Sequence, residues 1–373
     1  MEYTQRYLEL NSQFQLGIDT HLDESNIDIR FCSFHSSPQL VKAEKLLATP
    51  DDSKIDENFS FVYPIFMPSG IKKAEKAILL LHGLNERNWS KYLTWAEYLC
   101  KETGKAVILF PIAFHVNRSP LSWTNPRDLK YLLDFRRQKN GEDRSLSFAN
   151  ATFSERISEE PSRFYSSGRQ SINDLSCLFG EIKNGSHPLF IENTKIDIFS
   201  YSIGAFLAEI TIMTNPQNLF TDSKLFMLCG GGTFSSMRGE SRFIMDKKAY
   251  ESLFQYYLKK FSTDIKLSTL RDKAFEAFNS MISVERNQKE RVSFFEQLGN
   301  RLKGISLAKD KVMPYFGVTE ALGNRCASNR ISQMDFPFDY SHENPFPVGK
   351  HINWKEVDAS FTNIFSQAVE FLA

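Results

Sequence analysis

Short apolar runs recur along this chain, separated by segments with apolar residues at helical spacing. Such runs are typical of strands that are covered on both faces, so we expect a mostly parallel sheet with helices on either side. The predicted strands of this sheet are 77–83, 106–111, 195–199, 225–229, 304–308 and 330–336. Helical spacing at 95–100, 170–179, 203–210 and 354–372 completes a doubly wound α/β pattern.

The N-terminal part of the chain shows a different pattern. Residues 27–34 alternate apolar and polar side chains, and residues 59–66 form a second strand-like run. Alternation is expected of a half-buried strand, so the two segments predict an antiparallel edge leading into the main sheet. We therefore divide the chain into an N-terminal extension with an edge strand, residues 1–58, and a main domain, residues 59–373.

Two long segments interrupt the alternation of strands and helices. Residues 112–168 are polar and aromatic without clear periodicity, which predicts a long loop insertion, and loops of this length are usually functional. Residues 235–302 contain no strand-like run and show helical spacing at 249–261 and 270–282. We expect the second segment to form a helical cap over the functional site.

Residues 195–210 change from strand to helix within one residue. A turn this tight forces its central residue, Ser202, into a strained backbone conformation and lifts its side chain clear of the sheet, provided that the residues two positions away are small. Gly204 meets this requirement, and Ser200 stands where the nucleophile elbow G-x-S-x-G has its first glycine. The alternative is a serine that merely ends an ordinary strand.

A nucleophilic serine needs a base to take its proton, and the base needs an acid to orient it. Asp310 directly follows the strand predicted at 304–308, and its alternative role is that of a turn residue capping the strand. His342 and His351 both lie between the last predicted strand and the terminal helix. We predict His342 as the base because it is nearer the strand end, which leaves His351 at the surface or the rim of the site.

With Ser202, Asp310 and His342 in this order, each just beyond a strand, the chain resembles the α/β-hydrolase superfamily, in the branch with a serine nucleophile and a helical cap. Three further segments are similar to the oxyanion, acid and histidine segments of that family: His82-Gly83, Asp-x-Val-x-Pro at 310–314 and His-Glu-Asn-Pro at 342–345. The resemblance covers residues 59–373. It implies an α/β-hydrolase fold whose cap is the segment 235–302.

The backbone N–H groups of Leu84 and Ile203 are the expected oxyanion hole, because they would face the charge that develops on the carbonyl oxygen of an ester. We expect His82 to shape the turn beside them and not to take part in the chemistry.

Further polar residues follow a strand end close to the predicted site. His115, Asn117 and Arg118 are candidates for binding the substrate, with Arg118 gripping an anionic group. A structural, salt-bridged Arg118 is an alternative that the sequence leaves open. Gly230-Gly231-Gly232 either opens space beside the nucleophile or forms a tight turn.

Composition narrows the choice of partners. Lys plus Arg and Asp plus Glu number 45 each, so charge gives no reason to expect nucleic acid or an anionic membrane surface as a partner. The five cysteines are scattered without a C-x-x-C pair, which predicts reduced core cysteines and no metal site. We expect no membrane span and a cytoplasmic protein, since no long apolar stretch and no apolar signal segment is present.

These observations predict a serine hydrolase that cleaves an ester or related acyl bond in a small-molecule acyl substrate, through an acyl-enzyme and without a cofactor. An acyltransferase or thioesterase using the same triad stays open, as does a non-catalytic ligand-binding protein with this fold. The sequence does not identify the substrate or the oligomeric state.

Overall fold

The computed structural model describes residues 2–37, 51–264 and 271–373. The strands in these residues form one nine-stranded sheet in the order β1-β2-β3-β5-β4-β6-β7-β8-β9. Strands β4 to β9 run parallel, whereas β1, β2 and β3 are antiparallel to their neighbours. The strands are β1 Thr20–Leu22, β2 Ile27–His35, β3 Ser60–Pro68, β4 Ala74–Leu81, β5 Ala106–Leu109, β6 Phe190–Tyr201, β7 Leu225–Leu228, β8 Leu302–Leu307 and β9 Ile331–Met334.

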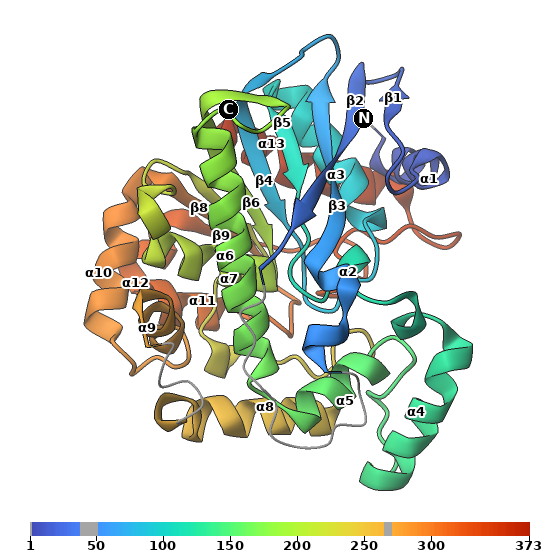
Figure 1. The fold of residues 1–373 in the computed structure, drawn as a ribbon, viewed down its shortest axis with the longest axis vertical. Helices are drawn as coiled ribbons and strands as arrows, with labels where there is room; N and C mark the ends of the chain where they lie inside the picture. The colour runs from blue at the N-terminus through green and yellow to red at the C-terminus, as the bar shows by residue number, and fades with distance from the viewer. Residues whose placement is uncertain (1, 38–50, 265–270) are drawn as a thin grey trace.

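Both faces of the sheet are buried under helices. In strand β4, Ile78 and Leu80 point into one apolar core and Leu79 and Leu81 into the other, so both faces of the strand must be covered. The first core is closed by α1 Tyr3–Gln13, α3 Ser90–Thr103 and α13 Trp354–Leu372. The second is closed by α6 Arg163–Lys183, α7 Ile203–Thr214, α9 Lys273–Ser280, α10 Gln288–Leu298, α11 Tyr315–Leu322 and α12 Asn324–Arg330 (Figure 1).

The predicted doubly wound, mostly parallel α/β class is confirmed. The antiparallel edge is also present, since β2 pairs with β3 along its whole length, from Ile27 opposite Pro68 to His35 opposite Ser60. The short helix α2 Asp56–Phe59 leads into β3. The boundary between residues 58 and 59 stays a prediction, and residues 38–50 of the N-terminal extension lie outside the described residues.

The expectation of a long loop at 112–168 is wrong. This segment contains α4 Pro126–Asn140 and α5 Ala151–Glu159, and α6 begins within it. The ends of α4 carry helix signals that its weak apolar periodicity obscured. Asn125 caps the helix by accepting a hydrogen bond from the Arg127 N–H, Pro126 occupies the first helical position, and Gly141 has a positive φ at the end.

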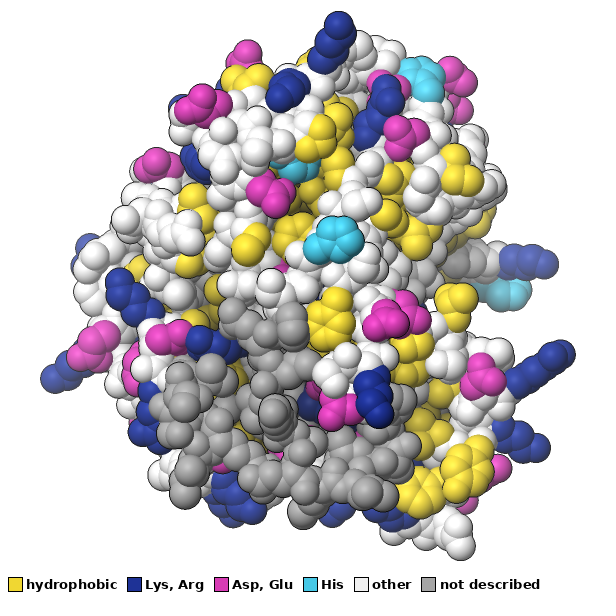
Figure 2. Space-filling view, viewed as in Figure 1, with side chains coloured by type: hydrophobic (Ala, Val, Ile, Leu, Met, Phe, Trp, Pro, Cys, Tyr) yellow, Lys and Arg dark blue, Asp and Glu magenta, His cyan; other side chains and the backbone are white. Residues whose placement is uncertain are grey.

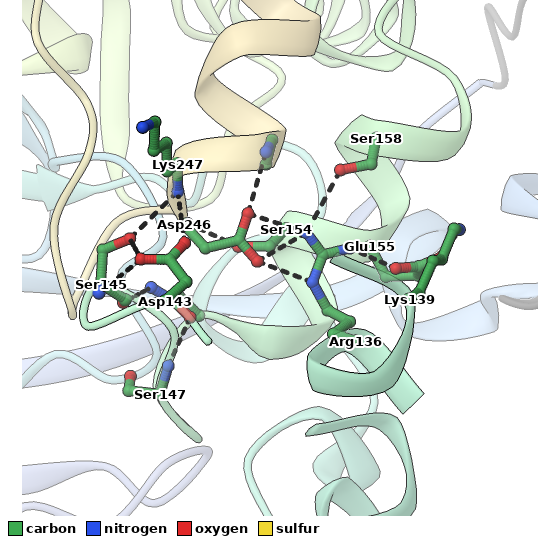
Figure 3. Close-up of polar contacts among 12 residues, drawn as sticks. Arg136, Lys139, Asp143, Ser145, Ser147, Ser154, Glu155, Ser158, Asp246 and Lys247 are labelled. Atoms are coloured by element: carbon green, nitrogen blue, oxygen red, sulfur yellow. Dashed lines mark hydrogen bonds and ion pairs between the residues drawn. The ribbon is translucent and has the colours of Figure 1, made fainter. Parts of the chain in front are cut away.

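A buried polar cluster joins this segment to α8 Lys247–Lys259 (Figure 3). The Arg136 guanidinium on α4 donates to both carboxylate oxygens of Asp246, at 2.7 Å each, and to Glu155 on α5. Asp246 in turn caps α8 by accepting from the Ala249 N–H at 2.9 Å. Because Arg136 is fully buried, losing its partners would leave an uncompensated charge, so the cluster holds α4, α5 and α8 together.

The described part of 235–302 is helical, with α8, α9 and α10, and Leu270 of the second predicted helix lies outside the described residues. Figure 1 shows α4, α5 and α8 grouped at the end of the molecule opposite the two termini. Helix α8 of the second insertion therefore lies with the helices of the first, whereas α9 and α10 pack against α7 and α11 over the second core.

On the face drawn in Figure 2, Lys and Arg side chains are interspersed with Asp and Glu side chains, in keeping with the balanced charge of the sequence. Among the described residues, no helix has the length and apolar character needed to cross a bilayer.

Candidate active site

Ser202 stands at the sharp turn between β6 and α7. Its φ of 57° and ψ of −124° lie outside the ordinary regions for a residue with a side chain, which is the strain expected at an elbow. A Cβ added to Gly204 would lie 2.6 Å from the Leu81 carbonyl oxygen, so only glycine fits there. Ser200 is small enough for the other tight position, where its buried hydroxyl donates to the Phe226 carbonyl at 3.1 Å.

Gly230, just after β7, allows a second close approach to the elbow. A Cβ at this position would lie 2.7 Å from the Ser202 carbonyl oxygen and 2.5 Å from the Ala205 Cβ. The run Gly230-Gly231-Gly232 therefore gives the backbone room beside the serine, which is one of the two roles considered for it.

Ser202, His342 and Asp310 form a continuous hydrogen-bonded chain. Ser202 Oγ lies 2.6 Å from His342 Nε2, and His342 Nδ1 lies 2.7 Å from Asp310 Oδ2. The other oxygen of Asp310 accepts from the N–H groups of Val312 and Met313 at 2.9 and 2.8 Å, which fixes the carboxylate toward the imidazole. All three side chains are at least 95% buried. The arrangement can transfer the serine proton to the imidazole while the carboxylate orients the ring.

The structure separates the two candidate histidines. His342 contacts both Ser202 and Asp310, whereas His351 is exposed and makes no side-chain hydrogen bond to either of them. Of the two, His342 is therefore placed to act as a base toward the serine.

The loop after β4 supplies the second side of the site. Leu84 and Ile203 line, together with Ser202, a small cavity that also includes Met237, Tyr250 and Leu253 from the second insertion. As the first residue of α7, Ile203 has no partner for its N–H within the helix. Both residues border the same cavity as Ser202, and the oxyanion hole formed by their N–H groups stays a prediction.

His82 shapes this loop, as expected. Its Nε2 accepts from the Ile112 N–H at 2.9 Å, so the ring proton is on Nδ1, which donates to the Gly83 carbonyl at 2.8 Å. Burial lowers the pKa of His82 well below its usual value and keeps the ring neutral.

The three predicted substrate-binding residues lie in different environments. The Arg118 guanidinium is fully buried and donates to Asp174 at 2.8 Å and to the Asn58 and Pro111 carbonyls, which is the structural alternative and not a substrate contact. Asn117 donates to the Val62 carbonyl at 2.8 Å and lies away from the cavities described here. His115 lines a large cavity that shares Leu84 and Ile203 with the small one.

Sequence reasoning missed the residues that form the outer walls of the site. Phe153, Arg156 and Ile157 on α5 line the large cavity, because the segment read as a loop is folded into a helix. Asn85, next to Leu84, donates to the carbonyls of Ala149 and Phe243 at 2.8 and 2.7 Å. The expected oxyanion loop is thus hydrogen-bonded to both insertions. Of these features, only the helices of the first insertion could have been predicted from the sequence, by their helix-capping signals.

The sheet order together with a serine at a strand-to-helix elbow defines the α/β-hydrolase fold that the sequence resemblance implied. The chain belongs to the family described as "Family of unknown function (DUF6051)", whose model matches residues 1–373. None of the curated proteins matches it.

Several solved structures are similar to this one at low sequence identity. An esterase from Pyrobaculum calidifontis is 11% identical with a TM-score of 0.46, and the match covers 100% of this chain and 90% of that chain. Carboxyl esterase 2 from the mycorrhizal fungus Tuber melanosporum is 10% identical with a TM-score of 0.49, and 100% and 99% of the chains are covered. A bacterial heroin esterase is 11% identical with a TM-score of 0.48 over 100% and 90%.

Proposed function

We propose that this protein is a serine hydrolase that cleaves an ester or related acyl bond. The observation that carries the proposal is the hydrogen-bonded chain from Ser202 through His342 to Asp310, with the serine held in a strained turn. A buried Ser-His-Asp chain at the end of parallel strands has the geometry that nucleophilic catalysis requires.

The expected reaction has two steps. Ser202 Oγ attacks the acyl carbon while His342 Nε2 takes its proton, and the N–H groups of Leu84 and Ile203 stabilise the resulting oxyanion. His342 then gives that proton to the leaving alcohol, which leaves an acyl-enzyme. A water molecule, deprotonated by the same nitrogen, releases the acid and restores the serine. Asp310 accepts the Nδ1–H of His342 throughout, so it holds the tautomer that makes Nε2 the base.

Labelling with a fluorophosphonate probe followed by peptide mapping tests this proposal directly. The adduct should be on Ser202 and should be absent in Ser202→Ala. Turnover of p-nitrophenyl esters, run beside an amide and a thioester, should fall at least about 10³-fold in the same variant. Labelling that survives Ser202→Ala, or a folded wild-type protein that neither labels nor hydrolyses any of these substrates, would sink the proposal.

Ser200→Gly is the matched control. It restores the more common small residue of the elbow and removes one hydroxyl that bonds only to the Phe226 carbonyl. This variant should label and turn over like the wild type, because the hydroxyl that it lacks is bonded to the Phe226 carbonyl, whereas His342 contacts Ser202.

A further inference from the structure

The large cavity extends the site beyond the triad. It lies against Leu84 and Ile203, which also line the small cavity with Ser202. Most of its wall is apolar, with Phe153 and Ile157 from α5 and Phe206 from α7. A chain attached to the acyl carbon could therefore enter this cavity.

Three polar side-chain atoms in this apolar wall have no hydrogen-bond partner among the described residues. They are His115 Nε2, Thr152 Oγ1 and Arg156 Nη1. All three residues are buried, with exposed fractions of 5% for His115, 5% for Thr152 and 4% for Arg156. Buried polar groups are nearly always hydrogen-bonded, because an unpaired one costs free energy, so three in one cavity point to a ligand that pairs with them.

The three residues lie close together. Thr152 and Arg156 are four positions apart on α5 and therefore share one face of the helix. The His115 ring packs against Phe153, with ring centroids 6.2 Å apart. The Arg156 guanidinium lies over the rings of Trp123 and Phe114, at 4.5 and 5.1 Å from their centroids. These cation–π contacts fix the orientation of the guanidinium plane.

The protonation states of Arg156 and His115 determine which ligand groups the three residues can bind. Burial lowers the pKa of Arg156 to about 10, which still leaves it cationic at neutral pH. Burial also lowers the pKa of His115 to about 4, and its Nδ1 lies 2.8 Å from the Ala113 carbonyl, so Nδ1 carries the proton and Nε2 is a free acceptor. The group thus offers a cationic donor, a hydroxyl and a neutral acceptor.

The surrounding charges leave Arg156 available for an anion. Its Nη2 donates to Asp52 Oδ1 at 2.6 Å, and Arg163, which also pairs with Glu159, approaches the same oxygen at 3.1 Å. Among the described residues, the charged ones that line the cavity are four arginines and one glutamate, and that glutamate, Glu86, pairs with Lys91 at 2.5 Å. A carboxylate entering the cavity meets donors and no unpaired acid within the described part of its wall.

We propose that the large cavity binds an acyl chain ending in a carboxylate, so that the preferred substrates are monoesters of dicarboxylic acids. The carboxylate accepts from Arg156 Nη1 and the Thr152 hydroxyl, and His115 Nε2 accepts a hydroxyl or N–H carried on the chain beside it. This inference rests on the proposed serine hydrolase function. It assigns the anionic contact to Arg156 in place of Arg118, which is sealed in the core.

The test compares matched esters. Monoethyl esters of succinic, glutaric, adipic and suberic acids are each paired with the ethyl ester of the monocarboxylic acid of the same chain length, and acid release is measured. At one or more lengths, kcat/KM of the wild type should favour the carboxylate-bearing ester by about tenfold or more, as expected for a charge-assisted hydrogen bond. Equal or higher kcat/KM for the neutral partner at every length would overturn the inference while leaving the hydrolase function intact.

Variants locate the contact. Arg156→Met should bring the ratio of the two kcat/KM values to about one, and Thr152→Val should lower it several-fold. Arg137→Met is the matched control, since it removes a half-exposed cation from α4 that pairs with Asp134 and does not line the cavity, and it should keep the ratio. A ratio that survives Arg156→Met would contradict the assignment.

Binding without turnover separates this inference from the reaction. In calorimetry, adipate and glutarate should bind to Ser202→Ala and should bind more weakly to the double variant Ser202→Ala/Thr152→Val. The double variant keeps the ion pair between Arg156 and Asp52, so it still tests the site if Arg156→Met does not fold. The absence of heat with every diacid would reject the carboxylate site. The absence of fluorophosphonate labelling at Ser202 would instead reject the proposed function.

Discussion

Tyr201 packs flat against the imidazole of His342, with ring centroids 5.6 Å apart and ring planes 15° from parallel, and its hydroxyl donates to the His342 backbone carbonyl. The residue before the elbow serine thus positions the histidine that the serine contacts. Because Tyr201 is buried, neither contact is open to competition from water.

Tyr201→Phe should keep the stacking and lose the hydrogen bond. We expect unfolding free energy to fall by about 1 kcal/mol and kcat/KM to fall a few-fold, because His342 keeps its bonds to Asp310 and Ser202 but loses one anchor. Urea unfolding and ester kinetics measure the two effects. Tyr201→Ala, which removes both contacts, should be clearly worse on both counts, and equal kinetics for the two variants would mean that Tyr201 does not position the ring.

The choice between the two histidines is open to a direct test. His342→Ala should reduce turnover at least about 10³-fold, as the loss of a triad base does. His351→Ala changes an exposed side chain and should stay close to wild-type activity. Activity that follows His351 and not His342 would refute the assignment of the base.

Gly204→Ala should disrupt the elbow, because the added Cβ would lie 2.6 and 2.7 Å from two backbone carbonyl oxygens that cannot move independently. We expect a loss of about 3 kcal/mol or more in unfolding free energy, measured by urea denaturation. Gly180→Ala, inside α6, meets nothing within 4 Å and should instead raise stability by about 0.5–1 kcal/mol. Similar values for both would show that the tight fit does not limit position 204.

His187 should make stability depend on pH. It is buried, its Nδ1 accepts from the Leu189 N–H at 3.2 Å and its Nε2 lies 2.8 Å from the Tyr63 hydroxyl, so protonation would break a bond. Burial lowers the pKa of His187 to about 4. Between about pH 6.5, the usual value for an unfolded chain, and pH 4, the unfolded state binds a proton that the folded state does not, so stability falls as pH falls, by about 1.4 kcal/mol per pH unit.

Urea unfolding of His187→Asn at pH 7, 6 and 5 measures this contribution. The variant is expected to be less stable at pH 7 but to lose less on acidification, while His115, whose pKa is lowered in the same way, maintains part of the slope. His351→Asn makes the same substitution at an exposed position and serves as the control. A slope in His187→Asn equal to that of the wild type would contradict the prediction.

The sequence predicted the sheet and the triad residues because both depend on local patterns. Apolar runs identify buried strands, and the strand ends bring Ser202, Asp310 and His342 to one edge of a parallel sheet. The same rule could not say which way a side chain turns. Arg118 follows a strand end as well, but its partner Asp174 lies on a distant helix, and this long-range ion pair draws the guanidinium into the core.

The residues of α5 that line the large cavity could not be predicted from the sequence, because the helix that carries them was not recognised. The helices α4 and α5 have polar faces that contact one another and α8 through the buried charges of Arg136, Glu155 and Asp246. Apolar periodicity is weak where charges form the interface, so the segment looked like a loop. Arg156 could not be recognised as a lining residue until that helix was known.

Gly204 and Gly230 have a consequence for how this family can diverge. A Cβ at position 204 would meet the Leu81 and His82 carbonyl oxygens, and one at position 230 would meet Ala205 Cβ and the Ser202 backbone, so neither position has space for a side chain. The wall of the large cavity is built from side chains, which can be exchanged for others of different size and charge. Divergent members should therefore keep the two glycines and vary along α5, so that substrate range drifts while the elbow stays constant.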